Sequence, residues 1–337
     1  MRKNFFALTL LLCSLTTMAQ ERKDTVVITL RNGTEVRYTS DKFDRVQIIY
    51  NLHYGVKVYL KDGKSKDYLA TEVRIAKYQS GGEVVTNNRN RNLYRAKLLE
   101  YPHLAADSTM NQLIIKSTPE FGITYSAEWS YRDKANRWSC YQMYTDNMLD
   151  TAQRKDDFRE DPEIPEEYRS KLEDYKGSGF SRGHLCPSAD RLCSTDQNKQ
   201  TFFLSNMQPQ WQKHNGVLWS NFENKVRIWA ENCDTLYVVK AATIRSDQVY
   251  EEKCNGKLLV PKYFYMALLA YYKDTDDYEA MALWTVHEDK SVTGADFKDY
   301  AISIDELEEL TGIDFFCNLP DDIEDEVESE CHKDKWK

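Results

Sequence analysis

Apolar and polar residues alternate through two stretches near the N-terminus, TVVITLRNGTEVRY (25–38) and VKVYLKDGKSKDY (56–68). Strict alternation is the pattern of a half-buried β-strand. Each stretch is interrupted by a turn dipeptide, Asn32-Gly33 or Asp62-Gly63, and such pairs favour the positive φ angles of a tight hairpin. Further strands are predicted at VQII (46–49) and VRI (73–75). Residues 20–78 are therefore predicted to form a small all-β module with a structural or docking role.

The pattern changes after QSGGEVVTNNRNRN (79–92), which has no periodic apolar residues, and we predict a linker over 79–94. Residues 95–318 then mix strand and helix patterns, which predicts one α+β domain. A helix is predicted over SIDELEELTGI (303–313), because Ser303 and Glu306 form a capping pair at its start. The strongest strand candidates are 235–244, 264–272 and 281–286.

From about Asn215 onwards, apolar residues recur at the spacing of an α-helix. The recurring positions are Leu218, Phe222, Val226, Trp229 and Cys233. They form one apolar face, and on a wheel of about 100° per residue Asn215, Glu223 and Arg227 cluster roughly a quarter-turn away from it. An amide, a carboxylate and a guanidinium are thus predicted to share one side of a helix. Upstream, FFLS (202–205) is predicted to be a short buried strand and Pro209 to mark a loop.

The composition is that of a globular protein, with 41% hydrophobic and 29% charged residues. A chain of 337 residues is long enough for more than one domain. The net charge of -9 gives no global basic signal, so nucleic-acid binding requires a local cationic cleft. Residues 319–337 form an acidic C-terminal tail, in which PDDIEDEVESE (320–330) is predicted to be a solvated charge run.

The chain begins MRKNFFALTLLLCSLTTMAQ, a basic start followed by a short apolar run and small residues. This pattern predicts a signal peptide over 1–19, because the run is short for a transmembrane helix. The mature protein is expected to be exported and to be periplasmic or extracellular. Its seven cysteines would then meet an oxidising compartment that favours disulfides, although an odd count leaves at least one thiol unpaired within the chain. His184, Cys186 and Cys193 are an alternative zinc set, but they lack a CxxC pair and a clear fourth ligand.

The stretch GSGFSRGHLCPSAD (177–190) and the predicted helix together contain the groups that phosphodiester hydrolysis needs. The reaction needs a base for water, a cation for the phosphoryl charge and help for the leaving oxygen. His184 is a candidate base, because imidazole is near-neutral at physiological pH. Asn215 offers a hard oxygen ligand for Mg²⁺. Glu223 is a candidate for orienting the waters of the metal, and Arg227 for stabilising phosphate charge.

Three motifs, SRGHLCPSADR (181–191), SNMQPQ (205–210) and HNGVLWSNFE (214–223), resemble the DNA/RNA non-specific endonuclease family, the endonuclease G-like ββα-metal (His-Me finger) nucleases. The resemblance covers roughly residues 95–318, and the N-terminal β module lies outside it. It implies an α+β nuclease domain with a central antiparallel sheet flanked by helices. It also implies a divalent cation, Mg²⁺ or another such as Mn²⁺, and DNA and RNA as substrates bound through their phosphate backbone.

The resemblance also implies roles for single residues. The DRGH motif of the family falls on residues 181–184, so His184 matches the general base and Arg182 an active-site arginine. Asn215 matches the metal-binding asparagine, and Glu223 the glutamate that holds the water shell of the metal. Further matches to the family site are Asn206, Arg227 and Arg154, with Arg159 as the alternative to Arg154.

One position departs from the family pattern, because Ser181 stands where the DRGH motif has aspartate. Asp190 and Asp196 are candidates to compensate for the missing carboxylate. His214 is the rival of Asn215 as a metal ligand, although its side chain is expected to point elsewhere on the helix.

The sequence therefore predicts an exported, Mg²⁺-dependent, sugar-non-specific endonuclease preceded by a β module. Two alternatives remain from the residues alone: a phosphodiesterase or pyrophosphatase acting on another substrate, and a catalytically weak nucleic-acid-binding module. A third is a protein whose β module binds a partner while the nuclease part is secondary.

Overall fold

The computed structural model describes residues 25–32, 34–51, 54–69, 72–79, 98–105 and 109–337. The chain divides into two compact units, residues 1–86 and 87–337, and this boundary falls inside the predicted linker. The predicted signal peptide lies outside the described residues. Among the residues described, no helix is long and apolar enough to cross a membrane.

The first unit contains two three-stranded antiparallel sheets, β2-β1-β6 and β3-β4-β5. The strands are β1 (Thr25–Leu30), β2 (Glu35–Thr39), β3 (Phe43–Asn51), β4 (Tyr54–Leu60), β5 (Ser65–Tyr68) and β6 (Val73–Gln79). Both predicted hairpins are confirmed, and Gly63 has the positive φ of 83° that the second turn requires. Val26, Ile28 and Val58 are buried in one cluster within the first unit. The alternation of apolar and polar residues along the strands therefore gives this unit its own small core.

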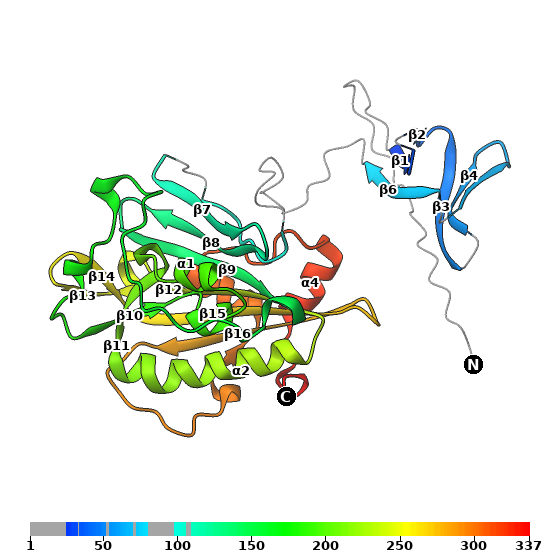
Figure 1. Cartoon of the computed structure of the whole chain (residues 1–337). Coiled ribbons are helices and arrows are strands. Elements are labelled where there is room, and N and C mark those ends of the chain that lie inside the picture. The colour runs from blue at the N-terminus through cyan, green and yellow to red at the C-terminus, as the bar shows by residue number, and fades with distance from the viewer. Residues whose placement is uncertain (1–24, 33, 52–53, 70–71, 80–97, 106–108) are drawn as a thin grey trace. The chain divides into compact units, whose positions relative to one another are not determined.

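The second unit is built on a seven-stranded antiparallel sheet with the order β17-β16-β15-β12-β9-β8-β7 (Figure 1). Its strands are β7 (Asn111–Thr118), β8 (Gly122–Ser130), β9 (Ala135–Met143), β12 (Thr235–Ala242), β15 (Tyr263–Tyr272), β16 (Asp277–Val286) and β17 (Ala301–Ile302). Two shorter ribbons are β10 (Phe180–His184) with β11 (Met207–Trp211), and β13 (Val249–Cys254) with β14 (Leu258–Pro261). The three strands predicted in the 235–286 region are confirmed as β12, β15 and β16.

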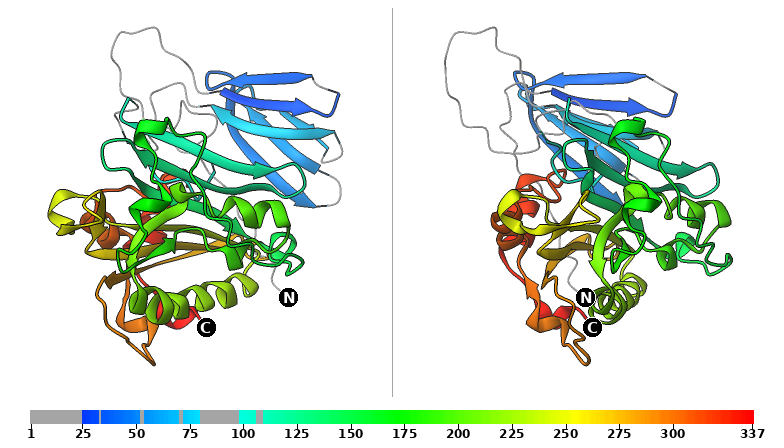
Figure 2. Two further views of the ribbon diagram at one scale, coloured as in Figure 1. Left: turned by 60° about the vertical axis from the view of Figure 1, so that its left-hand side comes forward. Right: turned by 90° about the vertical axis from the view of Figure 1, so that its left-hand side faces the viewer.

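Helices cover both faces of this sheet (Figure 2). They are α1 (Thr195–Gln200), α2 (Ser220–Glu231), α3 (Ile304–Thr311) and α4 (Asp321–Ser329). The predicted cap of α3 is confirmed, because the Ser303 hydroxyl accepts a hydrogen bond from the Glu306 amide at 3.1 Å. Along β15, Phe264 and Met266 pack in the core beneath α2, whereas Tyr265 and Ala267 pack in the core beneath α3 and α4. The strict alternation of strand side chains thus separates two cores, one on each face.

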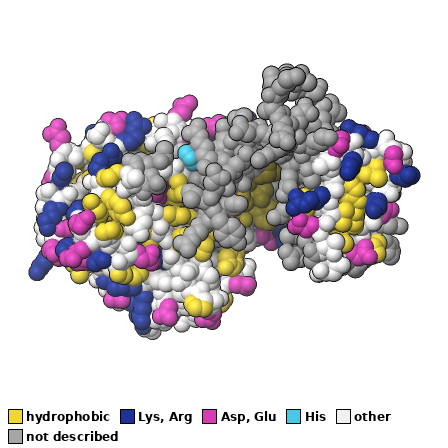
Figure 3. Space-filling view, turned by 90° about the horizontal axis from the view of Figure 1, so that it is seen from above, with side chains coloured by type: hydrophobic (Ala, Val, Ile, Leu, Met, Phe, Trp, Pro, Cys, Tyr) yellow, Lys and Arg dark blue, Asp and Glu magenta, His cyan; other side chains and the backbone are white. Residues whose placement is uncertain are grey.

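Basic and acidic side chains are interspersed on the molecular surface. On the face drawn in Figure 3, Lys and Arg lie among Asp and Glu in the second unit, with apolar side chains between them. This mixture agrees with the modest net charge of -9. A binding site for a polyanion must therefore be a local feature of the fold.

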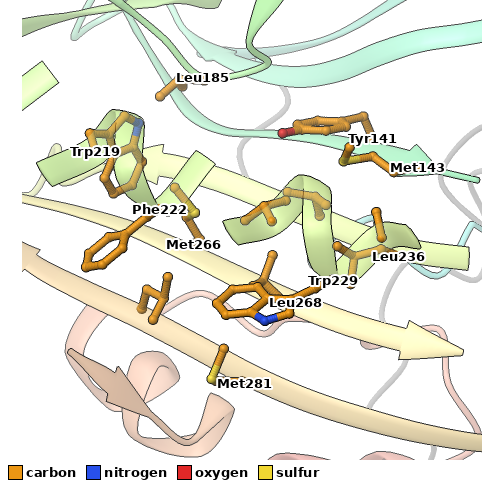
Figure 4. Packing of buried hydrophobic residues seen from close by; sticks show 14 of the residues in the cluster. Tyr141, Met143, Leu185, Trp219, Phe222, Trp229, Leu236, Met266, Leu268 and Met281 are labelled. Atoms are coloured by element: carbon orange, nitrogen blue, oxygen red, sulfur yellow. The ribbon is translucent and has the colours of Figure 1, made fainter. Parts of the chain in front are cut away.

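The apolar stripe predicted along the 215–233 helix is confirmed. Leu218, Phe222, Val226 and Trp229 are all buried, and Figure 4 shows Phe222 and Trp229 packed over Met266, Leu268 and Met281 of the sheet. The helix does not begin as an α-helix, however, because a π-helical turn, His214–Trp219, precedes α2. Such turns are frequent at functional sites. The α-helical spacing of about 100° per residue, which placed Asn215 beside Glu223 and Arg227, therefore holds only from Ser220 onward.

The prediction of a solvated acidic tail is wrong. Residues 321–329 form α4, in which Glu324 and Glu328 are buried and Ile323 and Val327 pack against the core beneath α3. The apolar residues are spaced four apart, so one face of an otherwise acidic helix can dock. Trp336 is also buried, at 5% exposure, against Trp229 of α2.

Two local predictions upstream of α2 are also wrong. Phe202 lies in a turn, Phe203 forms only an isolated β-bridge with Arg159, and Leu204–Asn206 form a 3₁₀ turn, so no strand forms here. Pro209 lies inside β11 and not in a loop. A two-stranded ribbon tolerates proline, since one side of each strand has no partner to bond with.

Candidate active site

The motif residues are brought together by an antiparallel ribbon followed by a helix. β10 carries Arg182 and His184 and pairs with β11, which directly precedes the π turn. The turn carries Asn215, and α2 continues from it. The three motifs, which are separated along the chain, therefore form one ββα unit beside the central sheet (Figure 1).

Gly183 allows the two strands of the ribbon to carry a large buried side chain between them. A Cβ atom at position 183 would lie 2.8 Å from Cβ of Gln210 and would overlap its carboxamide. Gln210 is fully buried, and its Nε2 lies 2.8 Å from Nδ1 of His214. The glycine of the motif is therefore required by packing inside the ribbon.

His214 is held in the core by both of its ring nitrogens. Nε2 lies 3.1 Å from the Thr285 hydroxyl, which itself donates to the Phe264 carbonyl at 3.0 Å. The hydroxyl must therefore accept from His214, whose Nδ1 in turn accepts from Gln210. Burial lowers the pKa of His214 to about 3, so the ring is neutral. His214 points away from the cleft as expected, and it is not available as a metal ligand.

Asn215 faces an open cleft instead. Within the described residues its carboxamide makes no hydrogen bond, and no side-chain cap is present at the start of the turn. The side chain therefore does not act as a helix cap. It is free to coordinate a hard cation through its oxygen.

His184 ends β10 with its ring between two phenylalanines. The ring centroids lie 5.1 Å from Phe202 and 5.7 Å from Phe158. Among the described residues, Nε2 is buried and has no hydrogen-bond partner, whereas the residue as a whole is partly exposed. Nδ1 is therefore the nitrogen that reaches solvent.

The pKa of His184 is lowered to about 3. Burial is the first cause, followed by three nearby positive charges, those of Arg154, Lys240 and Arg182. Both causes disfavour the imidazolium ion. His184 is consequently neutral at pH 7 and can accept a proton.

Glu223 is held by a lysine that sequence reasoning missed. Lys240 of β12 is 1% exposed, its ammonium group donates a hydrogen bond to Glu223, and it lies 5.2 Å over the Trp219 ring. Burial raises the pKa of Glu223, while the charge of Lys240 acts in the opposite direction. A polar residue in the apolar run TLYVVKAATI was the available signal, since buried lysines are rare unless paired.

Arg227 forms an ion pair with Asp190 at 2.7 Å, and Asp190 also accepts a hydrogen bond from the Tyr141 hydroxyl at 2.8 Å. Asp190 is thus committed to these two partners and does not replace the carboxylate missing at Ser181. Asp196 does not replace it either, because its side chain is 81% exposed on α1, 4.0 Å from Lys199. The departure from the family motif is therefore not compensated by either candidate.

The remaining arginines differ in their availability. Arg182 is exposed, stacks on the Phe158 ring at 3.9 Å and has no ion-pair partner within the described residues. Arg154 binds Asp156 and Ser188, both at 2.8 Å, and lines the same cleft. Arg159 instead stacks on Phe203 and pairs with Asp157, outside the cleft lining. The structure favours Arg154 over the alternative.

Asn206 is completely buried, and its carboxamide bonds mainly to the backbone, with one further hydrogen bond from the Ser139 hydroxyl. Its oxygen accepts from the Cys186 amide at 2.9 Å, and its nitrogen donates to the carbonyls of Cys186 and Thr201 at 2.8 and 2.9 Å. These bonds fix the chain two residues after His184. Asn206 is therefore a positioning residue in this structure.

The ββα unit borders a cleft of about 820 Å³. The residues of the predicted site that line it are Arg154, Arg182, Ser181 and Asn215, and Lys176 adds a further positive charge. His184, Glu223 and Arg227 are not among the lining residues, although the charges of Arg154 and Arg182 act on His184. The cleft offers free guanidinium and carboxamide groups beside a neutral imidazole.

The predicted disulfides are not formed, since all seven cysteines of the described residues carry free thiols and five of them are buried. Burial raises the pKa of Cys186 to about 12, so this thiol behaves as a small apolar side chain. Cys193 donates a hydrogen bond to Gln197. Among the described residues, His184, Cys186 and Cys193 do not bring their ligand atoms into one cluster, which argues against the zinc alternative.

A ribbon that ends in a histidine is followed by a helix with a cleft-facing asparagine, which is the ββα arrangement that the sequence motifs predicted. The chain belongs to the DNA/RNA non-specific endonuclease family, whose sequence model matches residues 106–322. By family and relatives it is a nuclease, a phosphodiester hydrolase. The family typically uses a divalent metal ion.

Relatives support this assignment. A nuclease of Nostoc sp. is 30% identical over 226 residues, which cover 65% of this chain and 78% of the relative. Nuclease C1 of Cunninghamella echinulata is 29% identical over 58% of this chain and 81% of its own length. A chain of the solved EndoG/EndoGI complex has a TM-score of 0.54 at 21% identity, covering 62% of this chain and 88% of its own, and shares the fold.

Proposed function

We propose that this protein is an exported, Mg²⁺-dependent endonuclease that hydrolyses both DNA and RNA, with His184 as the general base. The observation that carries the proposal is the ββα unit, in which β10 ends at His184 and the following turn places Asn215 in the cleft with Arg154 and Arg182. Family membership supplies the substrate class. The N-terminal sequence supports export to the periplasm or medium.

His184 takes the proton of the attacking water at Nδ1, the nitrogen that reaches solvent. In the resting protein, burial and then the surrounding positive charges lower the pKa of His184 and make the ring a weak base. A phosphate group bound against Arg182 and Arg154 offsets those charges and raises the pKa of His184 towards its ordinary range. Substrate binding thereby strengthens the base at the moment it is needed.

The residues present fit a bound divalent cation. The carboxamide of Asn215 is unpartnered within the described residues and faces the cleft, and Glu223 lies on the same helix with its carboxylate held by Lys240. Asn215 would hold Mg²⁺, and Glu223 would orient its waters by hydrogen bonding. When bound, the cation supplies electrostatic stabilisation of the charge on the phosphoryl oxygens.

Three arginines surround the position of the scissile phosphate in this proposal. Arg182 and Arg154 line the cleft and bind phosphoryl oxygens through charge-assisted hydrogen bonds. Arg227 acts from α2, where Asp190 fixes its orientation. Because these contacts reach the backbone and not the bases, little base preference and a strong salt dependence are expected.

The test uses supercoiled plasmid and a long RNA as substrates, with Mg²⁺ or with EDTA. The wild type is expected to cleave both in Mg²⁺ and neither in EDTA. His184→Ala is expected to lose activity by a factor on the order of 10²–10⁴, the usual contribution of a general base. His332→Ala is the matched control, because that side chain is 48% exposed, pairs with Glu279 and Glu330, and does not line the cleft.

Each part of the proposal has its own contrary result. Failure of the wild type to nick plasmid in Mg²⁺ or Mn²⁺ would contradict the proposed endonuclease activity. Full activity in His184→Ala would contradict the assignment of His184 as the base, but not the reaction class. Recovery of a secreted product that still carries residues 1–19 would contradict the prediction that these residues are a cleaved signal peptide.

A further inference from the structure

The helices α3 and α4 turn acidic faces towards one another on the side of the sheet that lies away from α2. Asp305 and Glu308 are three residues apart on α3, and Glu324 and Glu328 are four apart on α4, so each pair shares a helix face. One carboxylate oxygen from each of Asp305, Glu308 and Glu328 lies within 4.8 Å of the others. Among the described residues, this is the one such group of potential metal ligands.

Two carboxylates at this cluster, those of Glu324 and Glu328, are buried without positive partners. Glu328 is 4% exposed and Glu324 is 7% exposed. Oε1 of Glu328 and Oε2 of Glu324 are buried and lack a hydrogen-bond partner in the described part of the chain. Of the described lysines, arginines and histidines, none forms an ion pair with these two glutamates or with Asp305 and Glu308. Buried charge of one sign without compensation is strongly unfavourable.

The position of Glu328 in its helix adds to this cost. Glu328 lies in the last turn of α4, where the helix dipole disfavours a carboxylate. A bound cation would remove this cost.

We propose that Asp305, Glu308 and Glu328 form a Ca²⁺-binding site that joins α3 to α4, with Glu324 beside it. The carboxylate oxygens are hard ligands and lie within 4.8 Å of one another. Ca²⁺–oxygen distances of 2.3–2.6 Å allow ligands on opposite sides of the ion to be about 5 Å apart, so the cluster has room for Ca²⁺. Asp305 is exposed, so water can complete the coordination from that side.

The site would have a structural role. It lies over the core formed by Ile304, Leu307 and Phe315, whereas α2 and the nuclease residues belong to the opposite face. Ile323 and Val327 already dock α4 by apolar contact, and the ion would neutralise the charge that opposes this docking. The site is therefore independent of nucleic-acid cleavage.

The test measures Ca²⁺ binding to the full chain after chelator treatment, by isothermal titration calorimetry and by thermal unfolding. Asn215→Ala serves as the background, so that a cation in the nuclease site does not contribute. Ca²⁺ at about 100 times its Kd is expected to raise the Tm by roughly 5 °C or more. Adding Glu328→Gln is expected to abolish both the heat of binding and the Tm shift.

Glu326→Gln in the same background is the matched control, since Glu326 is an exposed residue of α4 that loses the same charge. It is expected to keep the heat and the shift. Asp305→Asn tests the site at an exposed position, where misfolding is not a concern, and is expected to weaken binding at least tenfold. Unchanged Ca²⁺ binding in Glu328→Gln and Asp305→Asn, or no binding in the Asn215→Ala background, would overturn the proposal. Nuclease activity plays no part in this readout.

Discussion

At the scale of single residues, Lys240 connects two parts of the site. Its ammonium group donates to Glu223, and its charge contributes to the lowered pKa of His184. The residue does not line the cleft. Lys240 therefore acts on the chemistry through the orientation and protonation of other side chains.

Replacing Lys240 with methionine is expected to shift the acid limb of the pH–kcat/KM profile to higher pH. Loss of the positive charge removes one cause that lowers the pKa of His184 and one that lowers the pKa of Glu223. Both pKa values rise, so the inactive protonated forms appear at higher pH. The kcat at neutral pH is expected to fall roughly 10-fold to 100-fold, as for other residues that orient metal-site groups.

Lys290→Met is the control for the Lys240 variant, because Lys290 is exposed on a loop. Its pH profile is expected to match that of the wild type. A Lys240→Met enzyme with lowered kcat and an unmoved acid limb would indicate a purely structural role.

The sequence motifs predicted some of the residues that line the cleft. Residues 181–184 and 215 were located by motif, and the structure places Arg182, Ser181 and Asn215 around one cleft. The partner of Asp190 and the role of Lys240 could not be predicted, because each depends on a contact between segments far apart in sequence. The sequence indicated which groups were present but not their partners.

At the scale of elements, the ribbon β10–β11 holds the π turn through buried contacts. Gly183 leaves room for Gln210, and Gln210 binds His214, the residue before Asn215. The cleft-facing position of Asn215 therefore depends on packing inside the ribbon.

Gly183→Ala is expected to lower stability by about 1–3 kcal/mol, the usual cost of overpacking. It is also expected to reduce nicking, because displaced Gln210 would release His214 and the turn. Gly216→Ala is the matched control: an added Cβ there meets no atom within 4 Å, and φ is not positive. Thermal unfolding and plasmid nicking measure both effects. Equal Tm values for the two variants would contradict this account of the ribbon.

Periodicity predicted several elements correctly, including both N-terminal hairpins, the strands β12, β15 and β16, and the stripe along α2. Apolar spacing did not predict the π turn, and the contact of His214 with Thr285 joins segments far apart in sequence. The failure at residues 320–330 has a similar cause. Charge dominates the composition of α4, but the docking of two apolar residues decides its structure.

At the scale of the whole molecule, the chain end closes the core of the nuclease unit. Trp336 is 5% exposed, and its ring centroid lies 5.2 Å from that of Trp229 in α2. The segment after α4 thus crosses to the face of the sheet that α2 covers, so both cores include C-terminal residues. Residues beyond the family match at 322 take part in the stability of the unit.

Trp336→Ala is expected to destabilise the protein by about 3 kcal/mol, within the range measured for large-to-small changes in cores. The loss arises from the cavity left against Trp229. Asp334→Asn is the control, since the carboxylate of Asp334 is 94% exposed and its ion pair with Lys298 lies on the surface. Urea unfolding followed by tryptophan fluorescence measures the difference. A midpoint for Trp336→Ala equal to that of the control would show that the chain end is dispensable.

The sequence by itself determined the fold class, the family, the main strands and the identity of the groups that can do chemistry. These follow from local periodicity and from motifs, which are properties of neighbouring residues. Tertiary structure alone decided which charges are paired, which thiols stay free, and which histidine is anchored in the core by both ring nitrogens. Burial and the approach of distant segments set the protonation and availability of a side chain, and neither is a property of a short stretch of chain.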